Sequence, residues 1–163
     1  MTAMAHLLRR LARREAGNIM VEFALALPVL LLMTVGMFDL GRYGLQKSAI
    51  LEGARQGAQY AVLAYSGATS ASSSDSTAVN TTAQNATGLS GVTASNSLFC
   101  ECQAGTAVAC TTTCSSGTLK RYVTVTTSKS FSSVVGKSSL DLGSFGKWTP
   151  PTSMSASITM IVP

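Results

Sequence analysis

The chain has little charge and almost no histidine. Only 12% of its 163 residues are charged, about half the share in an ordinary soluble domain. The single histidine is His6, and beyond residue 66 the carboxylates are Asp75, Glu101 and Asp141, far apart in sequence. Nucleophilic and acid–base catalysis needs such groups together. We therefore predict that the protein is not an enzyme and that it uses no cofactor or metal.

Basic charge is also scarce outside the N-terminus. The net charge is +5, but four arginines lie within the first 14 residues. Removing residues 1–17 takes away these four arginines and Glu15, which leaves a side-chain charge of +2. Nucleic-acid binding needs basic side chains gathered on one folded face. We therefore predict no nucleic-acid partner.

A long apolar run follows the arginines. Residues 23–38 contain no charge, and residues 18–38 contain only Glu22. A bilayer core needs about 20 helical residues, which predicts a transmembrane helix over about 19–40. The arginines place the N-terminus in the cytoplasm and the remainder outside it. A cleaved secretory signal and a plain uncleaved anchor are the alternatives, although no Ala-x-Ala cleavage pattern follows the run.

The helical pattern continues beyond the apolar run, which predicts one helix over 18–65. Ala49, Gly53, Gly57 and Ala61 recur at intervals of four and therefore share one helix face. Such small residues let another backbone approach closely. The stripe packs either on the protein's own sheet or against other subunits, and both remain open.

The remaining sequence predicts a small β domain. Residues 66–97 hold 15 serines and threonines in 32 positions, typical of a loop or linker, with a short helix over 76–87. Alternating segments from residue 98 onwards predict an antiparallel sheet over 98–163, interrupted by a glycine- and proline-rich loop over 136–151 around Trp148. The fold class is thus α+β, with a long N-terminal helix followed by a small antiparallel sheet.

All four cysteines, Cys100, Cys102, Cys110 and Cys114, lie close together in the predicted sheet. Export from the cytoplasm favours disulfides, whereas a four-thiolate zinc site usually has wider C-x2–4-C spacing. Nested 102–110 and 100–114 bridges would suit a hairpin. The sequence leaves the three possible pairings open.

Residues 16–65 resemble a known family. A basic leader ending at Gly17, followed by "NIMVEF" with a glutamate at the fifth position, resembles the class III signal of type IV pilins and pseudopilins. The continuation through the proline of the apolar run, "FDLGR" and "EGARQGAQYA" is similar to the TadE-like family, pseudopilins or minor pilins of tight-adherence (Flp-type) pili.

The resemblance implies processing and assembly. A prepilin peptidase would cut between Gly17 and Asn18, removing the leader 1–17. The Glu22 carboxylate would then neutralise the new amine of a neighbouring subunit, or it would merely snorkel at the membrane interface. Implied partners are the membrane, other pilin subunits, the peptidase and an inner-membrane assembly platform.

The sequence therefore predicts a membrane-anchored pseudopilin or minor pilin of a tight-adherence pilus. The expected location is the bacterial inner membrane, with the C-terminal domain in the periplasm and possible transfer into the surface pilus. The alternative is an unprocessed, membrane-tethered envelope protein or adhesin.

Overall fold

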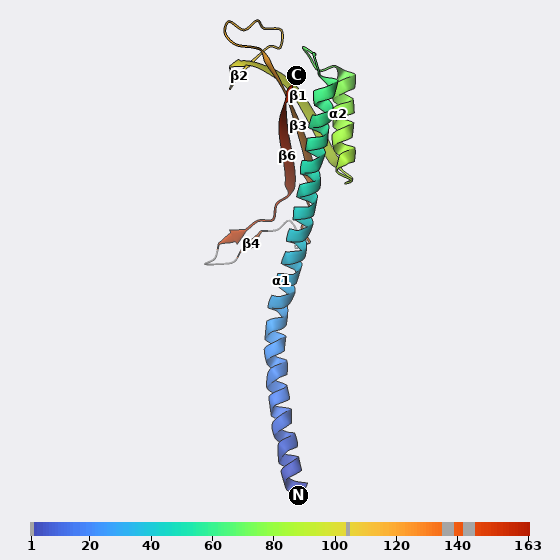
Figure 1. Ribbon diagram of the computed structural model, residues 1–163. Helices are drawn as coiled ribbons and strands as arrows, with labels where there is room; N and C mark the ends of the chain where they lie inside the picture. Colours follow the sequence, from blue (N-terminus) through green and yellow to red (C-terminus); the bar gives the residue numbers. More distant parts are fainter. Residues whose placement is uncertain (1, 104, 135–138, 142–145) are drawn as a thin grey trace. The chain divides into compact units, whose positions relative to one another are not determined.

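Two compact units make up the chain, Met1–Gly41 and Arg42–Pro163. The structure, a computed structural model, describes residues 2–103, 105–134, 139–141 and 146–163. Helix α1 (Thr2–Ala64) begins in the first unit and ends in the second (Figure 1). Its helical backbone includes the predicted leader from Thr2 onwards and the predicted 18–65 segment up to Ala64, one residue short of the prediction, and Pro28 lies inside it.

The second unit combines the end of α1 with a further helix and the strands. These elements are α2 (Ser73–Ala86), β1 (Val92–Gln103), β2 (Thr106–Val108), β3 (Lys120–Ser130), β4 (Leu140–Asp141), β5 (Lys147–Trp148) and β6 (Ser153–Val162). The main sheet has the order β2-β1-β3-β6 with antiparallel pairs throughout, while β4 and β5 pair separately. The predicted α+β class is confirmed.

Two element boundaries differ from the sequence prediction. β1 begins at Val92, inside the segment predicted as a serine- and threonine-rich loop, because its small polar residues alternate with inward-facing Val92, Ala94 and Asn96. α2 begins at Ser73 rather than near 76, because the Ser72 hydroxyl accepts a hydrogen bond from the Asp75 N–H and caps the helix.

The segment 136–151, which the sequence predicts to be a loop, is not a loop throughout. It contains the short β4–β5 pair, which includes Trp148 in its backbone pairing. Residues 136–138 and 142–145 of that prediction, and Ala104 between β1 and β2, lie outside the described residues.

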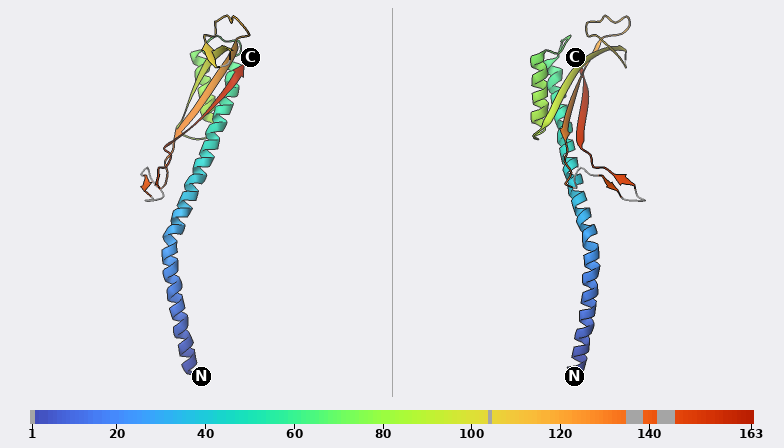
Figure 2. Two further views of the ribbon diagram at one scale, coloured as in Figure 1. Left: turned by 90° about the vertical axis from the view of Figure 1, so that its left-hand side faces the viewer. Right: turned by 180° about the vertical axis from the view of Figure 1, so that it is seen from behind.

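The core of the second unit lies between the helices and one face of the main sheet. The end of α1 and α2 lie on the same side of this sheet (Figure 2). Ala58 and Ala61 of α1 and Val79 of α2 are fully buried with Val123 and Val125 of β3. A second cluster joins Ile50 and Ala54 of α1 to residues at the start of β6. The sheet therefore has one covered and one open face.

A buried polar network joins the three layers at one end. The Tyr65 hydroxyl, at the end of α1, donates to Asn96 Oδ1 of β1 at 2.7 Å. Asn96 Nδ2 in turn donates to the Ser76 carbonyl at 2.9 Å and to Asn80 Oδ1 at 2.8 Å, both on α2. Because Tyr65 is fully buried, these bonds satisfy a hydroxyl that would otherwise destabilise the core.

Two glycines of the small-residue stripe set the distance between α1 and α2. A Cβ atom on Gly53 would lie 2.6 Å from the Ala83 carbonyl oxygen, and it would also overlap Thr87 Cγ2. A Cβ atom on Gly57 would lie 2.6 Å from Ala83 Cβ and 3.1 Å from Val125 Cγ1. Only glycine fits this approach, so part of the stripe packs within the protein's own second unit.

We expect Gly57→Ala to destabilise the protein by about 1–3 kcal/mol, because the overlap with Ala83 outweighs the roughly 1 kcal/mol gained in helix propensity. The matched control is Gly44→Ala, where a Cβ would meet nothing within 4 Å. This control should leave stability unchanged or raise it slightly. Urea unfolding of the full chain in detergent measures both, and equal effects of the two substitutions would contradict the packing argument.

Two disulfides close the end of the sheet. Cys100 pairs with Cys110, and Cys102 pairs with Cys114, with Cα atoms 5.0 Å and 5.5 Å apart. The nested pairing considered from the sequence is not the one formed. The reason is that β2 ends at Val108 and the chain turns, with the Thr112 N–H bonded to the Ala109 carbonyl, which returns Cys110 to Cys100.

Thiol counting distinguishes the two pairings. Cys100→Ser with Cys110→Ser should leave no free thiol after folding, because Cys102 and Cys114 still pair. Cys100→Ser with Cys114→Ser should leave two, because the fold does not bring Cys102 to Cys110. Maleimide labelling of the exported, denatured protein counts the thiols. The nested pairing would give the opposite result.

Candidate assembly and binding surfaces

The first unit presents an apolar helical surface. From Ile19 to Phe38 every side chain is exposed, and the exposed residues include leucines, valines, methionines and both phenylalanines of this segment. Among the described residues, one helix is apolar and long enough to cross a membrane, and none of its apolar window is buried. A membrane or other helices are the surroundings that this surface requires.

The residues predicted for processing and assembly lie at the start of this surface. Gly17 and Asn18 are within the continuous helix α1. Glu22 follows Asn18 by four residues, which is about one helical turn. The Glu22 side chain is exposed, and it makes no hydrogen bond or ion pair with any residue whose side chain the structure describes.

The four residues of the predicted small-residue stripe lie in the second unit and are not all equally buried. Gly53, Gly57 and Ala61 are buried, whereas Ala49 is half-buried. Contacts to α2 and β3 occupy Gly53 and Gly57, as described above. The same part of α1 also carries the exposed side chains of Leu45, Tyr60 and Leu63.

An aromatic contact lies near the start of the second unit. The rings of Tyr43 and Phe131 meet edge to face with centroids 5.4 Å apart, and the Arg42 guanidinium lies 5.9 Å from the centre of the Phe131 ring. Phe131 is buried, and its N–H donates to the Thr152 carbonyl. This contact fixes the chain just after β3 against the beginning of the second unit.

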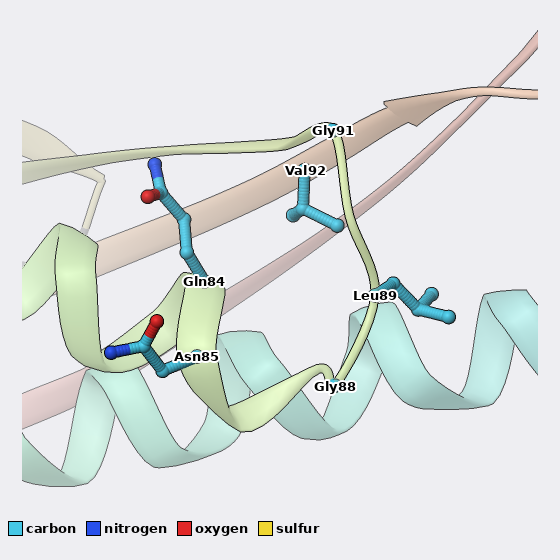
Figure 3. Close-up of a pocket in the computed structure, with 6 residues that line it drawn as sticks. All are labelled: Gln84, Asn85, Gly88, Leu89, Gly91 and Val92. Atoms are coloured by element: carbon cyan, nitrogen blue, oxygen red, sulfur yellow. The ribbon is translucent and has the colours of Figure 1, made fainter.

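A shallow hollow of about 330 Å³ lies between the end of α2 and the start of β1 (Figure 3). Its lining residues are Gln84, Asn85, Gly88, Leu89, Gly91 and Val92. The Gln84 side chain reaches from α2 towards β1, while Leu89 points away from the two amides (Figure 3). None of these side chains titrates. In the part of the chain that the structure describes, no group of three or more His, Cys, Asp or Glu residues could hold a metal ion.

The open face of the main sheet forms a third surface, which we call the hydroxyl face. Its members are the outward-facing serines and threonines of three neighbouring strands: Thr93, Ser95, Ser97, Thr124, Thr126, Ser128, Ser155, Ser157 and Thr159. The burial of each strand alternates, with the other residues turned towards the helices. The hydroxyl face is therefore a continuous array across β1, β3 and β6.

Hydroxyl groups on this face bond to one another across the strands. Thr93 pairs with Ser128, Thr124 with Thr159 and Thr126 with Ser157, each at 2.8 Å between the side-chain oxygens.

The next row along the strands is apolar. Phe99 and Tyr122 stack with ring centroids 5.4 Å apart, and Ile161, opposite Tyr122, is 56% exposed. We call these three residues the aromatic row.

Sequence reasoning identified the strands but missed this surface. Its signal was the alternation of hydroxyl residues in "VTASNS", "YVTVTTS" and "SASIT". Alternation shows that such residues share a face, but the antiparallel register is needed to place the three sets side by side.

Comparison with known proteins shows that residues 17–59 are similar to a family of pilus components, which is not an enzyme family. That family is the TadE-like protein family, whose model matches these residues. No curated protein matches the chain, and no solved structure does. The match agrees with the resemblance found in the sequence, and it indicates a protein related to tight-adherence pili.

Proposed function

We propose that the protein is a membrane-anchored pseudopilin or minor pilin that is processed after Gly17 and helps to assemble a tight-adherence pilus. The observation that carries this proposal is the position of the TadE-like match relative to the predicted leader and the apolar run. The TadE-like match begins at Gly17, the last residue of the predicted leader, and the apolar run with its single charge, Glu22, follows directly over residues 18–38. Residues 1–16 thus precede the family segment, and the predicted leader ends at the first residue of that segment.

The lone carboxylate of the apolar segment supports assembly. An ionised carboxylate without a partner costs several kcal/mol in a lipid environment. Cleavage would create a positive amine on Asn18, one turn from Glu22 on the same helix. When processed subunits pack side by side, the Glu22 carboxylate of one subunit would neutralise the amine of another. Such a pair would fix the axial register of neighbouring helices.

The two units differ in whether their apolar side chains are buried or exposed, and this difference suggests different roles for them. The second unit buries its own small-residue contacts between α1, α2 and β3. From Ile19 to Phe38, the first unit leaves its apolar side chains exposed. We infer that other pilin subunits and the inner-membrane assembly platform contact the first unit, with the arginine-rich end in the cytoplasm, where a prepilin peptidase acts, and the second unit in the periplasm.

The mass of the mature N-terminus tests processing. In cells with an active prepilin peptidase, we expect a chain that begins at Asn18, and in cells without the peptidase we expect the intact leader. Gly17→Val should also retain the leader, because a β-branched side chain replaces the residue at the cut. Gly36→Val is the matched control, since a Cβ there meets nothing within 4 Å, and it should be processed normally.

An intact leader in the presence of the peptidase would overturn the pseudopilin proposal. It would favour the alternative, an unprocessed and membrane-tethered envelope protein or adhesin. Intact-protein mass spectrometry of the membrane fraction gives this answer directly.

A second experiment tests Glu22 itself. Glu22→Gln keeps the size of the side chain but removes the charge, so we expect normal processing and membrane insertion with a loss of assembly of at least tenfold. The amount of protein that co-purifies with other pilin subunits or appears in sheared pili measures assembly. Glu52→Gln is the control, because Glu52 is an exposed carboxylate bonded to Gln56 in the second unit. Normal assembly of Glu22→Gln would refute the pairing.

A further inference from the structure

The hydroxyl face carries no charge over nine adjacent positions. Typical exposed surfaces are about 25–35% charged, so about two or three charges would be expected there. On the outward side of β1 and β3, the nearest charged residues lie in the row beyond the aromatic row, where Glu101 is opposite Lys120. The ammonium group of Lys47, on α1, donates to the backbone carbonyl of Ser155 on the edge strand β6. The nine side chains of the face themselves offer no ionic partner to a phosphate or an acidic polymer. The chemistry of the face fits a neutral ligand.

The hydroxyl face is well supplied with both donors and acceptors. Each serine or threonine hydroxyl has one donor and two acceptor positions. A pair such as Thr126 and Ser157 uses one donor and one acceptor in its mutual bond, which leaves one donor and three acceptor positions for a ligand. Sugar hydroxyls have the same dual character. A neutral polyhydroxyl ligand can therefore exchange its bonds with water for bonds with this array.

The aromatic row adds an apolar contact at the end of the array. Phe99 and Tyr122 are half-buried, and Ile161 is 56% exposed. Sugar rings combine hydroxyl groups with apolar C–H surfaces, and exposed aromatic and aliphatic side chains contact such surfaces. The hydroxyl face and the aromatic row together thus offer both kinds of contact that a sugar chain requires.

The dimensions of this surface fit an extended ligand. Strands lie about 4.8 Å apart, and alternate residues along a strand are about 6.8 Å apart. Three strands and four rows, counting the aromatic row, therefore span roughly 10 Å by 20 Å. A second copy of the chain is a poorer fit, because stacking two hydroxyl faces would bury hydroxyl groups where stable interfaces have an apolar core.

We propose that the hydroxyl face and the aromatic row bind a neutral, extended polysaccharide. The surface lies wholly in the second unit, and it does not depend on cleavage after Gly17 or on assembly into a pilus. Failure of the processing experiment would therefore leave this inference intact, and the reverse also holds.

Retention on microcrystalline cellulose tests the inference. The full chain is purified in a detergent without a sugar headgroup, because such a headgroup would compete for the face. We expect retention that does not fall when salt is raised from about 0.1 to 0.5 M, since no ionic contact is involved. Polygalacturonate, an acidic polymer, should not compete, whereas soluble hydroxyethyl cellulose should.

Paired variants assign the binding to this face. Thr124→Val with Thr126→Val removes two central hydroxyls and should lower the retained fraction at least fivefold. Thr81→Val makes the same chemical change on an exposed position of α2 and should leave retention unchanged. Ser157→Lys, at an exposed position of β6, is a second variant if the first fails to fold, and it should also reduce retention.

Three outcomes would overturn the inference. One is wild-type retention no greater than that of an unrelated membrane protein. Another is equal retention of wild type and either folded variant. The third is a change of oligomeric state in these variants without a change in retention, measured by light scattering, which would assign the face to a second copy of the chain.

Discussion

The close approach of α1 and α2 is the constraint on which the second unit depends. Both helices must cover one face of a narrow sheet, and their separation is set where Gly53 and Gly57 contact Ala83. Glycine in a helix weakens it by about 1 kcal/mol relative to alanine. That cost is offset because the approach completes the core around Val125. Without this close approach of α1 and α2, only one helix would cover the apolar face of the sheet.

The helices cover the inner face of the main sheet and leave its outer face exposed to solvent. Because side chains alternate between the two faces along each strand, the residues between the core positions determine the chemistry of the outer face. Val123, Val125 and Thr127 point inwards, and Thr127 bonds to the Ile50 carbonyl of α1. The residues between them point outwards and form the hydroxyl face. The same alternation that builds the core therefore builds the candidate binding surface, and hydroxyl pairs across the strands support the sheet by about 0.2–1 kcal/mol each.

The two units use apolar surface in opposite ways. The second unit packs apolar side chains of its helices and sheet into a core, and the disulfides and the Asn96 network link its elements. The first unit exposes its apolar side chains from Ile19 to Phe38, so the stability of this segment in a cell depends on the membrane or on neighbouring helices. A chain organised in this way suits a subunit that is anchored first and assembled later. This division is the physical basis for placing assembly in the first unit and ligand binding in the second.

The sequence by itself determined the apolar helix, the isolated Glu22, the α+β class and the TadE-like resemblance, because these depend on local period and composition. It could not decide which partner Gly53 and Gly57 would contact, since a small-residue stripe has the same pattern in either case. Nor could it decide the cysteine pairing, which follows from where β2 ends and the chain turns. The hydroxyl face existed only as three separate alternating segments. Tertiary structure decided its location because strand register is a long-range property, fixed by pairing residues about 30 positions apart along the chain.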